Sequence, residues 1–380
     1  MGAWTWYAAD LKTGYVATRL PLTPSSSPAK LLGAIGSANF NLPVTDRECP
    51  AGWEQVTEAG RTVIAGTVAD ANGYERLVWS GIVLRRVRSL NGVNVGLVCS
   101  SIETYLERRY VDSTLGPFVN ADQHHVFAAL IGHANTSGIG LLVDAPDSGV
   151  LRDRTEYYRY SDQQIYAMVD NLAKVEDGPE WTIRTSFAAD EPKRLAFTAM
   201  ARTPYIGAVV DPPPWVFSAP GNITELEYVE GYGDGEYANV AVAGGTGDGT
   251  ARIMSTSGLA QDTAQLAAGW PLMESRVSDS NLTTQESVDA LALGELASVR
   301  AGAHTIRVTI RTDDLPLGEL WGLGDTAAVR VEAWDQASQR GAAQFPSGLD
   351  STWRITGWEL DQGGDSIKPT LMAWPPPGEA

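Results

Sequence analysis

The residues that could do chemistry are few, and histidine is the first type to weigh. Three of the four histidines, His124, His125 and His133, lie in one short segment. Imidazole is a frequent metal ligand and a general base near neutral pH. A zinc-binding helix carries its histidines one turn apart with a glutamate between them, whereas His125 and His133 are eight positions apart. The spacing favours histidines at a surface or a helix cap and predicts no metal site.

A glycine-rich stretch, Gly244-Gly-Thr-Gly-Asp-Gly249, has the composition of a phosphate-binding loop. In that motif a Lys-Ser or Lys-Thr pair closes the loop and a helix follows, because the lysine and the hydroxyl contact the phosphates and the magnesium ion. Neither the pair nor a helical pattern follows Gly249. We therefore predict a hairpin loop at this position and no cofactor.

Acidic residues cluster at Asp144 with Asp147, at Asp313 with Asp314, and at Asp279. A calcium loop spaces its ligands regularly and ends on a glutamate, which none of these clusters does, so carboxylates in turns are expected. A serine nucleophile in a Gly-x-Ser-x-Gly motif is also absent. Hydrolysis by two carboxylates far apart in the sequence leaves no spacing signal, and that alternative stays open. We predict no catalytic residue.

The composition is that of a folded, acidic protein. The chain has 380 residues, enough for roughly two to four domains, and 43% of them are hydrophobic. Its formal net charge of −18 argues against non-specific nucleic-acid binding through a basic surface. Cys49 and Cys99 are the only cysteines, so no disulfide framework or cysteine-based metal site is expected. Neither a secretory signal nor a membrane-spanning run is recognisable.

Twelve tryptophans are many for this length. Exposed tryptophans could stack on sugars, whereas buried ones anchor cores and subunit interfaces. Seven of them lie in runs that look like strands: Trp4, Trp6, Trp79, Trp181, Trp334, Trp353 and Trp358. Aromatic side chains in strands usually pack, so core and interface positions are favoured over a carbohydrate-binding surface.

The elements that would position these residues are mostly strands. Residues 61–100 alternate in polarity and predict an antiparallel meander with turns at Asn72-Gly73 and Asn91-Gly92, because Asn-Gly supplies the positive φ angles of a type I′ turn. Further strands are expected in pairs or singly at Trp181–Phe187 with Arg194–Met200, Thr224–Val229 with Tyr237–Ala243, His304–Ile310, Ala327–Trp334, Trp353–Leu360 and Ile367–Met372. The proline-rich residues 211–215 predict an extended linker.

Capping residues mark four helix starts: Ser100 with Glu103, Asp122, Ser161 with Gln164, and Thr283 with Glu286. They predict a short helix as far as Arg109, a helix over 122–134, another after Gln164, and a long one over 284–299. In the last of these, apolar residues recur at helical spacing.

The ordered set of elements is similar to one known family. In the C-terminal part the matching residues are Leu315 to Leu320, Gly324-Asp325 with Val329, and Arg354-Ile-Thr-Gly-Trp358. In the N-terminal part they are Ser80-Gly-Ile-Val83 and Glu103 to Arg109, and residues 238–245 add a further match. Together they resemble the minor tail proteins that form the tail-tip or baseplate hub of siphophages, in particular those of actinobacteriophages.

The resemblance implies a β-rich α+β fold with two barrel-like β domains, similar to tail-tube subunits, and helical insertions. The expected divisions are a first β-barrel domain over 1–110, a connecting and insertion region over 111–220, a second β-barrel domain over 221–373 that contains helix 284–299, and a proline-rich tail over 374–380.

The same resemblance implies a structural role in the virion. Such hub proteins form a homotrimer that closes the tail tube and surrounds the DNA exit path. They contact the distal tail protein, the tape-measure protein and other tail-tip proteins after assembly in the host cytoplasm, without inserting into a membrane. DNA would pass through without being bound specifically. The alternatives are a carbohydrate-binding or cell-wall hydrolase module of the tail tip, and a soluble sandwich protein of unrelated role.

The net charge also fits a channel. An acidic wall would repel passing DNA and leave it free to slide, whereas a basic wall would hold it by counterion release. Asp234, Glu236 and Asp248 fall in turns where such a wall might be lined. Solubility alone explains the charge equally well.

Overall fold

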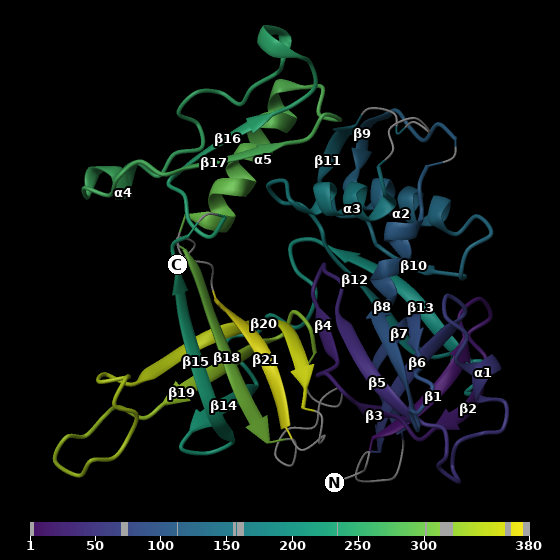
Figure 1. Cartoon of the computed structure of the whole chain (residues 1–380). Coiled ribbons are helices and arrows are strands. Elements are labelled where there is room, and N and C mark those ends of the chain that lie inside the picture. The colour runs from purple at the N-terminus through teal and green to yellow at the C-terminus, as the bar shows by residue number, and fades with distance from the viewer. Residues whose placement is uncertain are drawn as a thin grey trace.

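Two sheets of seven strands each dominate the computed structural model of the chain. The structure describes residues 4–69, 75–111, 113–154, 157, 163–233, 235–300, 302–311, 322–361 and 366–374. The two sheets occupy the lower half of Figure 1, and all the labelled helices except the first, α1, lie above them. The β-rich α+β class expected from the sequence is confirmed.

The first sheet is built almost entirely from the N-terminal hundred residues. Its strands are β1 (Thr5–Asp10), β2 (Val16–Leu20), β3 (Thr23–Pro24), β5 (Ser37–Pro43), β6 (Thr62–Ala69), β7 (Glu75–Val87) and β8 (Asn94–Ser101), in the order β2-β1-β6-β7-β8-β5-β3. Every second residue of β5 and β8 is buried, the burial pattern of strands with one face on a core. On that face Trp6, Phe40 and Trp79 pack edge to face, with ring centroids 4.6 Å apart for Trp6 and Phe40.

The predicted meander is confirmed, because β6, β7 and β8 pair antiparallel in sequence order. The turn expected at Asn72-Gly73 lies outside the described residues. The turn type expected at Asn91-Gly92 is wrong, because neither residue has a positive φ. Instead the amide of Gly92 donates to the carbonyl of Ser89 at 3.2 Å, which places the glycine at the last position of a four-residue turn, where it is also common.

The other face of the first sheet is covered by the middle of the chain. Its elements are η1 (Ile102–Arg108, a 3₁₀ helix), β9 (Phe118–Asp122), α2 (Gln123–Ala134), β10 (Leu142–Asp144), β11 (Leu151–Arg154), α3 (Ile165–Ala173), β12 (Glu180–Phe187) and β13 (Leu195–Arg202), while α1 (Trp53–Val56) is a single turn in the N-terminal region. Val63, Ala65 and Ile82 of the sheet join one buried cluster with Phe127 and Leu130 of α2. The hairpin of β12 and β13 is confirmed.

Two of the helix starts differ from the prediction. Ser101, not Ser100, precedes η1 and makes no capping hydrogen bond, because its hydroxyl accepts from the amide of Gly36 at 2.9 Å. Gln164 precedes α3 without a side-chain cap, and Ser161 lies outside the described residues. The start at Asp122 is confirmed, since its carboxylate accepts from the amide of His124.

The second sheet draws strands from well beyond the C-terminal region. It consists of β14 (Trp215–Ala219), β15 (Ile223–Gly231), β18 (Ala303–Arg311), β19 (Thr326–Val331), β20 (Leu349–Leu360) and β21 (Ser366–Ala373), in the order β14-β19-β20-β21-β18-β15, with β4 (Ala29–Leu31) paired to β20. Inward residues of both sheets, among them Phe40, Val308 and Ile355, belong to one buried cluster. The two sheets therefore share a core.

The predicted pairing of Thr224–Val229 with Tyr237–Ala243 is wrong. The first segment belongs to β15, which pairs with β18. The second contains β16 (Val240–Gly244), which pairs in parallel with β17 (Glu274–Ser278). The two strands separate because the small buried residues Ala241 and Ala243 pack with the apolar face of α5 (Gln285–Val299).

The unit formed by β16, β17 and α5 stands at the top of Figure 1. It also carries η3 (Gly249–Ala251) and α4 (Thr263–Ala267). Helix α5 begins one residue later than predicted, because Thr284 rather than Thr283 caps it, accepting from the amide of Ser287 at 3.2 Å. Over the ranges that the structure describes, no helix is long and apolar enough to span a membrane.

We expect Phe40→Ala to lower the free energy of unfolding by about 3–5 kcal/mol, because Phe40 is fully buried and its removal leaves a cavity. Denaturant unfolding would measure the change. Val93→Ala, at a side chain that is 58% exposed, is the control and should shift the value by less than about 0.5 kcal/mol. Equal effects from both variants would contradict the assignment of Phe40 to the core.

Candidate functional site at the junction of the sheets

Strand β20 of the second sheet pairs with strands from distant parts of the chain. Its residues 349–354 pair with β19, and residues 357–359 pair along the same edge with β4, which comes from the N-terminal region. The amide of Leu32 donates to Thr356 O and the amide of Leu360 donates to Pro28 O, both at 2.9 Å. A segment from the start of the chain therefore completes a sheet made mostly from its end.

Close packing fixes β4 against the first sheet as well. The indole Nε1 of Trp79 donates to Ala29 O at 2.9 Å. A Cβ atom at Gly36 would lie 2.0 Å from the same carbonyl oxygen, closer than any side chain can approach. Glycine is therefore required at position 36 for β4 to reach β20.

A buried ion pair connects β4 with the middle of the chain. Lys30 of β4 contacts the carboxylate of Glu103, which is fully buried in η1. Glu103 also accepts from the amide of Ile183 at 2.9 Å and the hydroxyl of Thr182 at 3.2 Å, both in β12. Because Lys30 also donates to Ile183 O at 3.0 Å, one charged pair joins three elements.

A second ion pair connects β20 with β12. Arg354 is 6% exposed and makes a two-point contact with Glu180. Its guanidinium also donates to Gly324 O at 3.0 Å and Ile206 O at 2.8 Å, and lies 4.9 Å from the ring centroid of Tyr205. Glu180 in turn accepts from the amide of Ile206 at 2.8 Å, so the network closes on itself.

Besides Arg354, two more of the residues that carried the family resemblance belong to this network. Gly324 has φ +88°, and a Cβ there would lie 1.9 Å from Ile206 O. Asp325 accepts from the amides of Ala208 at 2.7 Å and Gly322 at 2.8 Å. Gly324-Asp325 therefore forms the tight contact between the second sheet and the loop after β13. Leu315 to Leu320 lie outside the described residues.

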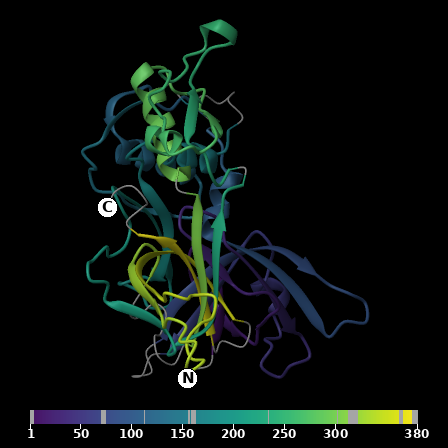
Figure 2. The same ribbon diagram turned by 90° about the vertical axis from the view of Figure 1, so that its left-hand side faces the viewer.

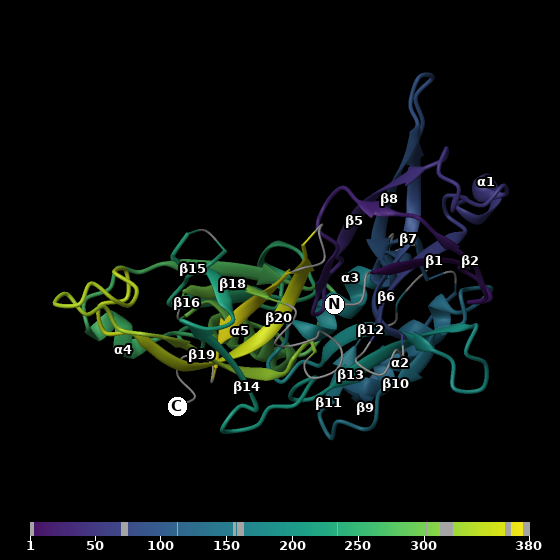
Figure 3. The ribbon, with the colours of Figure 1, turned by 90° about the horizontal axis from the view of Figure 1, so that it is seen from below.

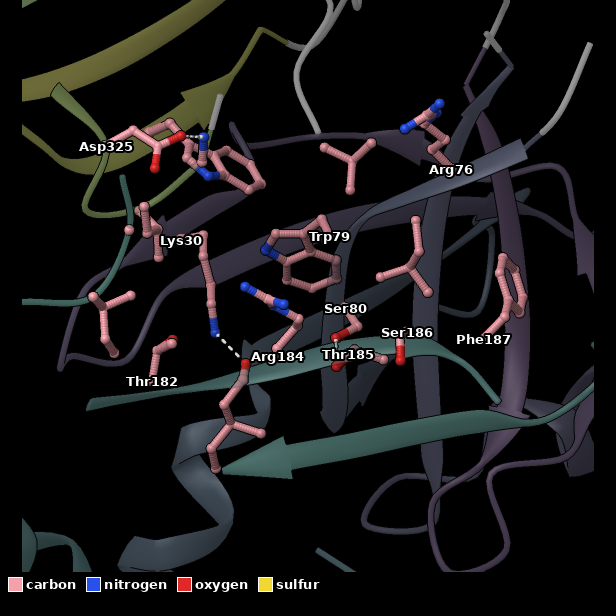
Figure 4. Close-up of a pocket in the computed structure, with 18 of the residues that line it drawn as sticks. Lys30, Arg76, Trp79, Ser80, Thr182, Arg184, Thr185, Ser186, Phe187 and Asp325 are labelled. Atoms are coloured by element: carbon pink, nitrogen blue, oxygen red, sulfur yellow. Dashed lines mark hydrogen bonds between the residues drawn. The ribbon is translucent and has the colours of Figure 1, made fainter. Parts of the chain in front are cut away.

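A cavity of about 600 Å³ opens beside the junction. Figure 4 shows β7 and β12 along its walls, with Trp79 and Arg184 between them. Ser80 and Thr185 bond through their hydroxyls at 2.7 Å across the gap. Its charged lining residues are Lys30, Glu75, Arg76, Arg184 and Asp325. The described lining residues include no histidine or cysteine, and no hydroxyl is paired with a base.

The three histidines do not converge. His124 is buried, with one ring nitrogen on Pro146 O and the other 3.0 Å from the hydroxyl of Thr203, so the expectation of a surface or cap position is wrong for it. His125 is exposed and lies 3.0 Å from Asp147. His133 lies in the last turn of α2. No group of three metal-ligating side chains occurs among the residues that the structure describes.

Of the clustered acidic residues that the structure describes, Asp147 and Asp279 lie in loops as expected, whereas Asp144 ends strand β10. Asp122 accepts from the amides of His124, Ser148 and Gly149. Burial alone would raise the pKa of Asp122, but these hydrogen bonds lower it below its usual value. Asp144 pairs with Arg202 at 2.7 Å and Asp279 accepts from the amide of Asn281 at 3.0 Å. Asp313 and Asp314 lie outside the described residues.

The glycine-rich stretch after Gly244 is a loop at the end of β16. The amide of Gly245 donates to Ile253 O at 2.8 Å, and the amide of Ile253 donates to Thr246 O at 3.0 Å. The loop therefore closes on itself by backbone hydrogen bonds.

Most of the strand tryptophans face cores. Five of the seven are buried, namely Trp6, Trp79, Trp181, Trp353 and Trp358. Trp4 is half-buried beside Trp6, and Trp334 is half-buried beyond the end of β19. These positions favour core packing over a sugar-stacking surface.

Comparison with known proteins gives the fold a context. No family model and no curated protein matches the sequence. The tail protein from Neisseria meningitidis MC58 has a similar structure, with a TM-score of 0.58, 12% identity and 98% of each chain covered. The 43 kDa tail protein of prophage MuSo2 from Shewanella oneidensis is also similar, with a TM-score of 0.54 and 13% sequence identity. The match covers 97% of this chain and 98% of that one. The chain has the fold of phage tail proteins.

A third tail protein also has a similar structure. The prophage tail protein gp18 from Listeria monocytogenes EGD-e gives a TM-score of 0.51 at 11% identity, with 97% of this chain and 94% of that one covered. The resemblance stated from sequence motifs is thus confirmed for the fold. The two ion pairs of the junction were not predicted. Glu103 and Arg354 belong to the motifs of the resemblance, but nothing in the sequence pairs them with Lys30 and Glu180, which are ordinary residue types far away in the chain.

We expect Glu180→Ala to lower the free energy of unfolding by about 3–5 kcal/mol, because it leaves the buried guanidinium of Arg354 without its partner. Thermal or denaturant unfolding would measure the loss. The matched control is Asp350→Ala, which removes the exposed partner of Arg330 and should cost less than about 1 kcal/mol. A Glu180 variant as stable as the control would refute the role assigned to this pair.

The lowered pKa of Asp122 gives a pH dependence with a defined sign. A carboxyl group whose folded pKa lies below its unfolded value stabilises the fold above the unfolded value, about 3.9, and loses that contribution as pH falls through the folded value. Asp122→Asn should therefore be less stable than the wild type at pH 7, with the difference shrinking below about pH 4.

Urea unfolding at several pH values would measure this difference. Asp248→Asn, at an exposed residue, is the control and should match the wild type throughout. A stability difference for Asp122→Asn that grew on acidification would contradict the assignment.

Proposed function

We propose that the protein is a structural subunit of a phage tail tip, the hub that closes the tail tube and surrounds the DNA exit path. The observation that carries the proposal is the fold match along nearly the whole length of three tail proteins, with little left over on either side. A match confined to one sheet would have supported only a shared domain.

The junction supports a mechanical role. A tail tip must hold its shape while a tube rests on it and DNA passes through it. The two sheets have one core in common, an N-terminal strand, β4, completes the second sheet, and two ion pairs tie that sheet to η1 and β12; such an arrangement resists relative movement better than two domains joined by a linker. Buried charged pairs also specify a single geometry, because breaking one leaves an uncompensated charge.

The proposed assembly is a homotrimer in a siphophage virion, formed in the host cytoplasm, with the distal tail protein and the tape-measure protein as neighbours. Each copy would present two barrel-like β domains, so three copies would match the six-fold symmetry of a tail tube. The division into domains over 1–110, 111–220 and 221–373 and a tail over 374–380 is part of this proposal. The strand order adds β4 and β14 to the second of the sheets.

The net charge of −18 suits a channel wall that DNA must pass without sticking. Glu236 and Asp248 are exposed in turns, whereas Asp234 lies outside the described residues. In this proposal part of the acidic surface faces the lumen, and the rest keeps the protein soluble.

We expect a map of the assembled tail to show three copies in one ring with an acidic inner wall. Electron cryomicroscopy of tails that contain this chain would test both statements. One or six copies would overturn the trimer. A neutral or basic inner wall would overturn the channel role of the charge while leaving the trimer standing.

We expect the purified chain to release no sugar from host cell wall. The two carboxylates that line the junction cavity are already hydrogen-bonded within the chain, Glu75 to the hydroxyl of Tyr7 and Asp325 to two backbone amides, and the strand tryptophans are mostly buried. A zymogram against host cell wall would check this, with lysozyme as the positive control. Clearing that disappears when one carboxylate is changed to its amide would support the hydrolase alternative instead.

A further inference from the structure

The hairpin of β7 and β8 differs in charge from the rest of the protein. From Arg76 to Ile102 the sequence contains no aspartate or glutamate, although the whole chain has 46 acidic residues against 28 basic ones. The same stretch contains four arginines: Arg76, Arg85, Arg86 and Arg88. A basic arm therefore projects from an acidic molecule.

The arm also ends in exposed apolar side chains. Leu84, Val87, Leu90 and Val93 are 42%, 53%, 101% and 58% exposed. Figures 2 and 3 show the hairpin projecting away from the body, so that its own chain does not cover these residues. Apolar groups gathered at the end of an ordered projection mark a contact surface.

The arm is also held in place close to its turn. Arg88 pairs with Glu54 at 2.9 Å and lies over the ring of Trp53 at 5.1 Å, and Arg86 donates to Glu54 O at 2.6 Å. Arg85 is exposed and makes no ion pair with any described residue. The hairpin thus presents Arg85 beside four exposed apolar side chains, in a position fixed by its two neighbouring arginines.

A groove with the opposite character lies elsewhere on the same chain. It has a volume of about 800 Å³ and lies between β11 and the first turns of α5. Its charged lining consists of four carboxylates, Asp153, Glu176, Glu286 and Asp289, and one guanidinium, Arg152. Leu151, which is 52% exposed, and Leu293 supply apolar surface. The groove therefore offers both contacts that the arm needs.

We propose that the tip of the β7–β8 hairpin of one copy docks in this acidic groove of a second copy. In Figure 3 the tip of the hairpin points away from β11 and α5, so a single copy cannot fill its own groove. The contact joins two different surfaces, so it can repeat from copy to copy around a ring. The inference names one contact of the self-association that the proposed function requires, and rests on that function for its setting.

The first experiment measures self-association of the full chain by sedimentation velocity over a range of protein and salt concentrations. Arg85→Glu and Glu286→Lys should each weaken association about tenfold or more, because each puts like charges across the contact. Arg19→Glu, at an exposed arginine on β2 of the same sheet, and Glu48→Lys, at an exposed glutamate, are the controls and should leave it unchanged. Matched melting temperatures would show that the variants are folded.

The second experiment mixes variants. An equimolar mixture of the Arg85→Glu chain and the Glu286→Lys chain should regain association in part, because the hairpin of either variant meets a groove of opposite charge on the other variant, and a ring of three copies can contain two such contacts. The double variant should regain it as well. Association that the single variants do not weaken, or that neither mixing nor doubling restores, would overturn the proposal, as would a wild-type chain that stays monomeric throughout.

Assembled particles separate this inference from the proposed function. If the hairpin variants failed to enter tails while their self-association was unchanged, the arm would contact a different tail protein and not a second copy of this chain. A three-copy ring whose hairpins lie free of the grooves would refute the docking and leave the hub role intact.

Discussion

The structure depends on a single strand that receives partners from both ends of the chain. β20 pairs with β19 over one half of its length and with β4 over the other half of the same edge. Without β4, backbone groups of β20 at the centre of the molecule would lose their partners, and such groups are costly to bury. The ion pair of Lys30 with Glu103 connects β4 with β12, because Glu103 also accepts from the amide of Ile183. The ion pair of Arg354 with Glu180 connects β20 with the same strand. Cooperation between the two sheets follows from that arrangement.

Local patterns in the sequence were sufficient to predict many of the strands and helices. Alternation identified the meander of β6, β7 and β8, and the carboxylate of Asp122 marked the start of α2. Partner choice between strands was harder. Tyr237–Ala243 was assigned to the wrong neighbour because alternation describes which face of a strand is buried and carries no information about which strand lies beside it.

The contacts at the junction could not be predicted from the sequence, for a related reason. A three-residue strand such as β4 is too short to show a periodicity. Nothing in the sequence indicates that Lys30 and Glu103 form a buried pair. Gly324 and Asp325 could be singled out only through resemblance to a family, and their physical role became visible from the position of Ile206 O. The charge of the β7–β8 hairpin, by contrast, can be read from the sequence, which has no acidic residue there. This absence becomes informative once the structure shows that the hairpin projects.

The position of β4 has a consequence for how the chain is made. Residues 29–31 leave the ribosome more than three hundred residues before the segment of β20 with which they pair. During synthesis the first sheet can form early, but its short extension must wait, and contacts between such distant residues form slowly. Closure of the second sheet is therefore a step that only a chain extended beyond β20 can take. A product that terminates early would keep β4 unpaired, which gives the cell's proteases a means to distinguish it from a finished subunit.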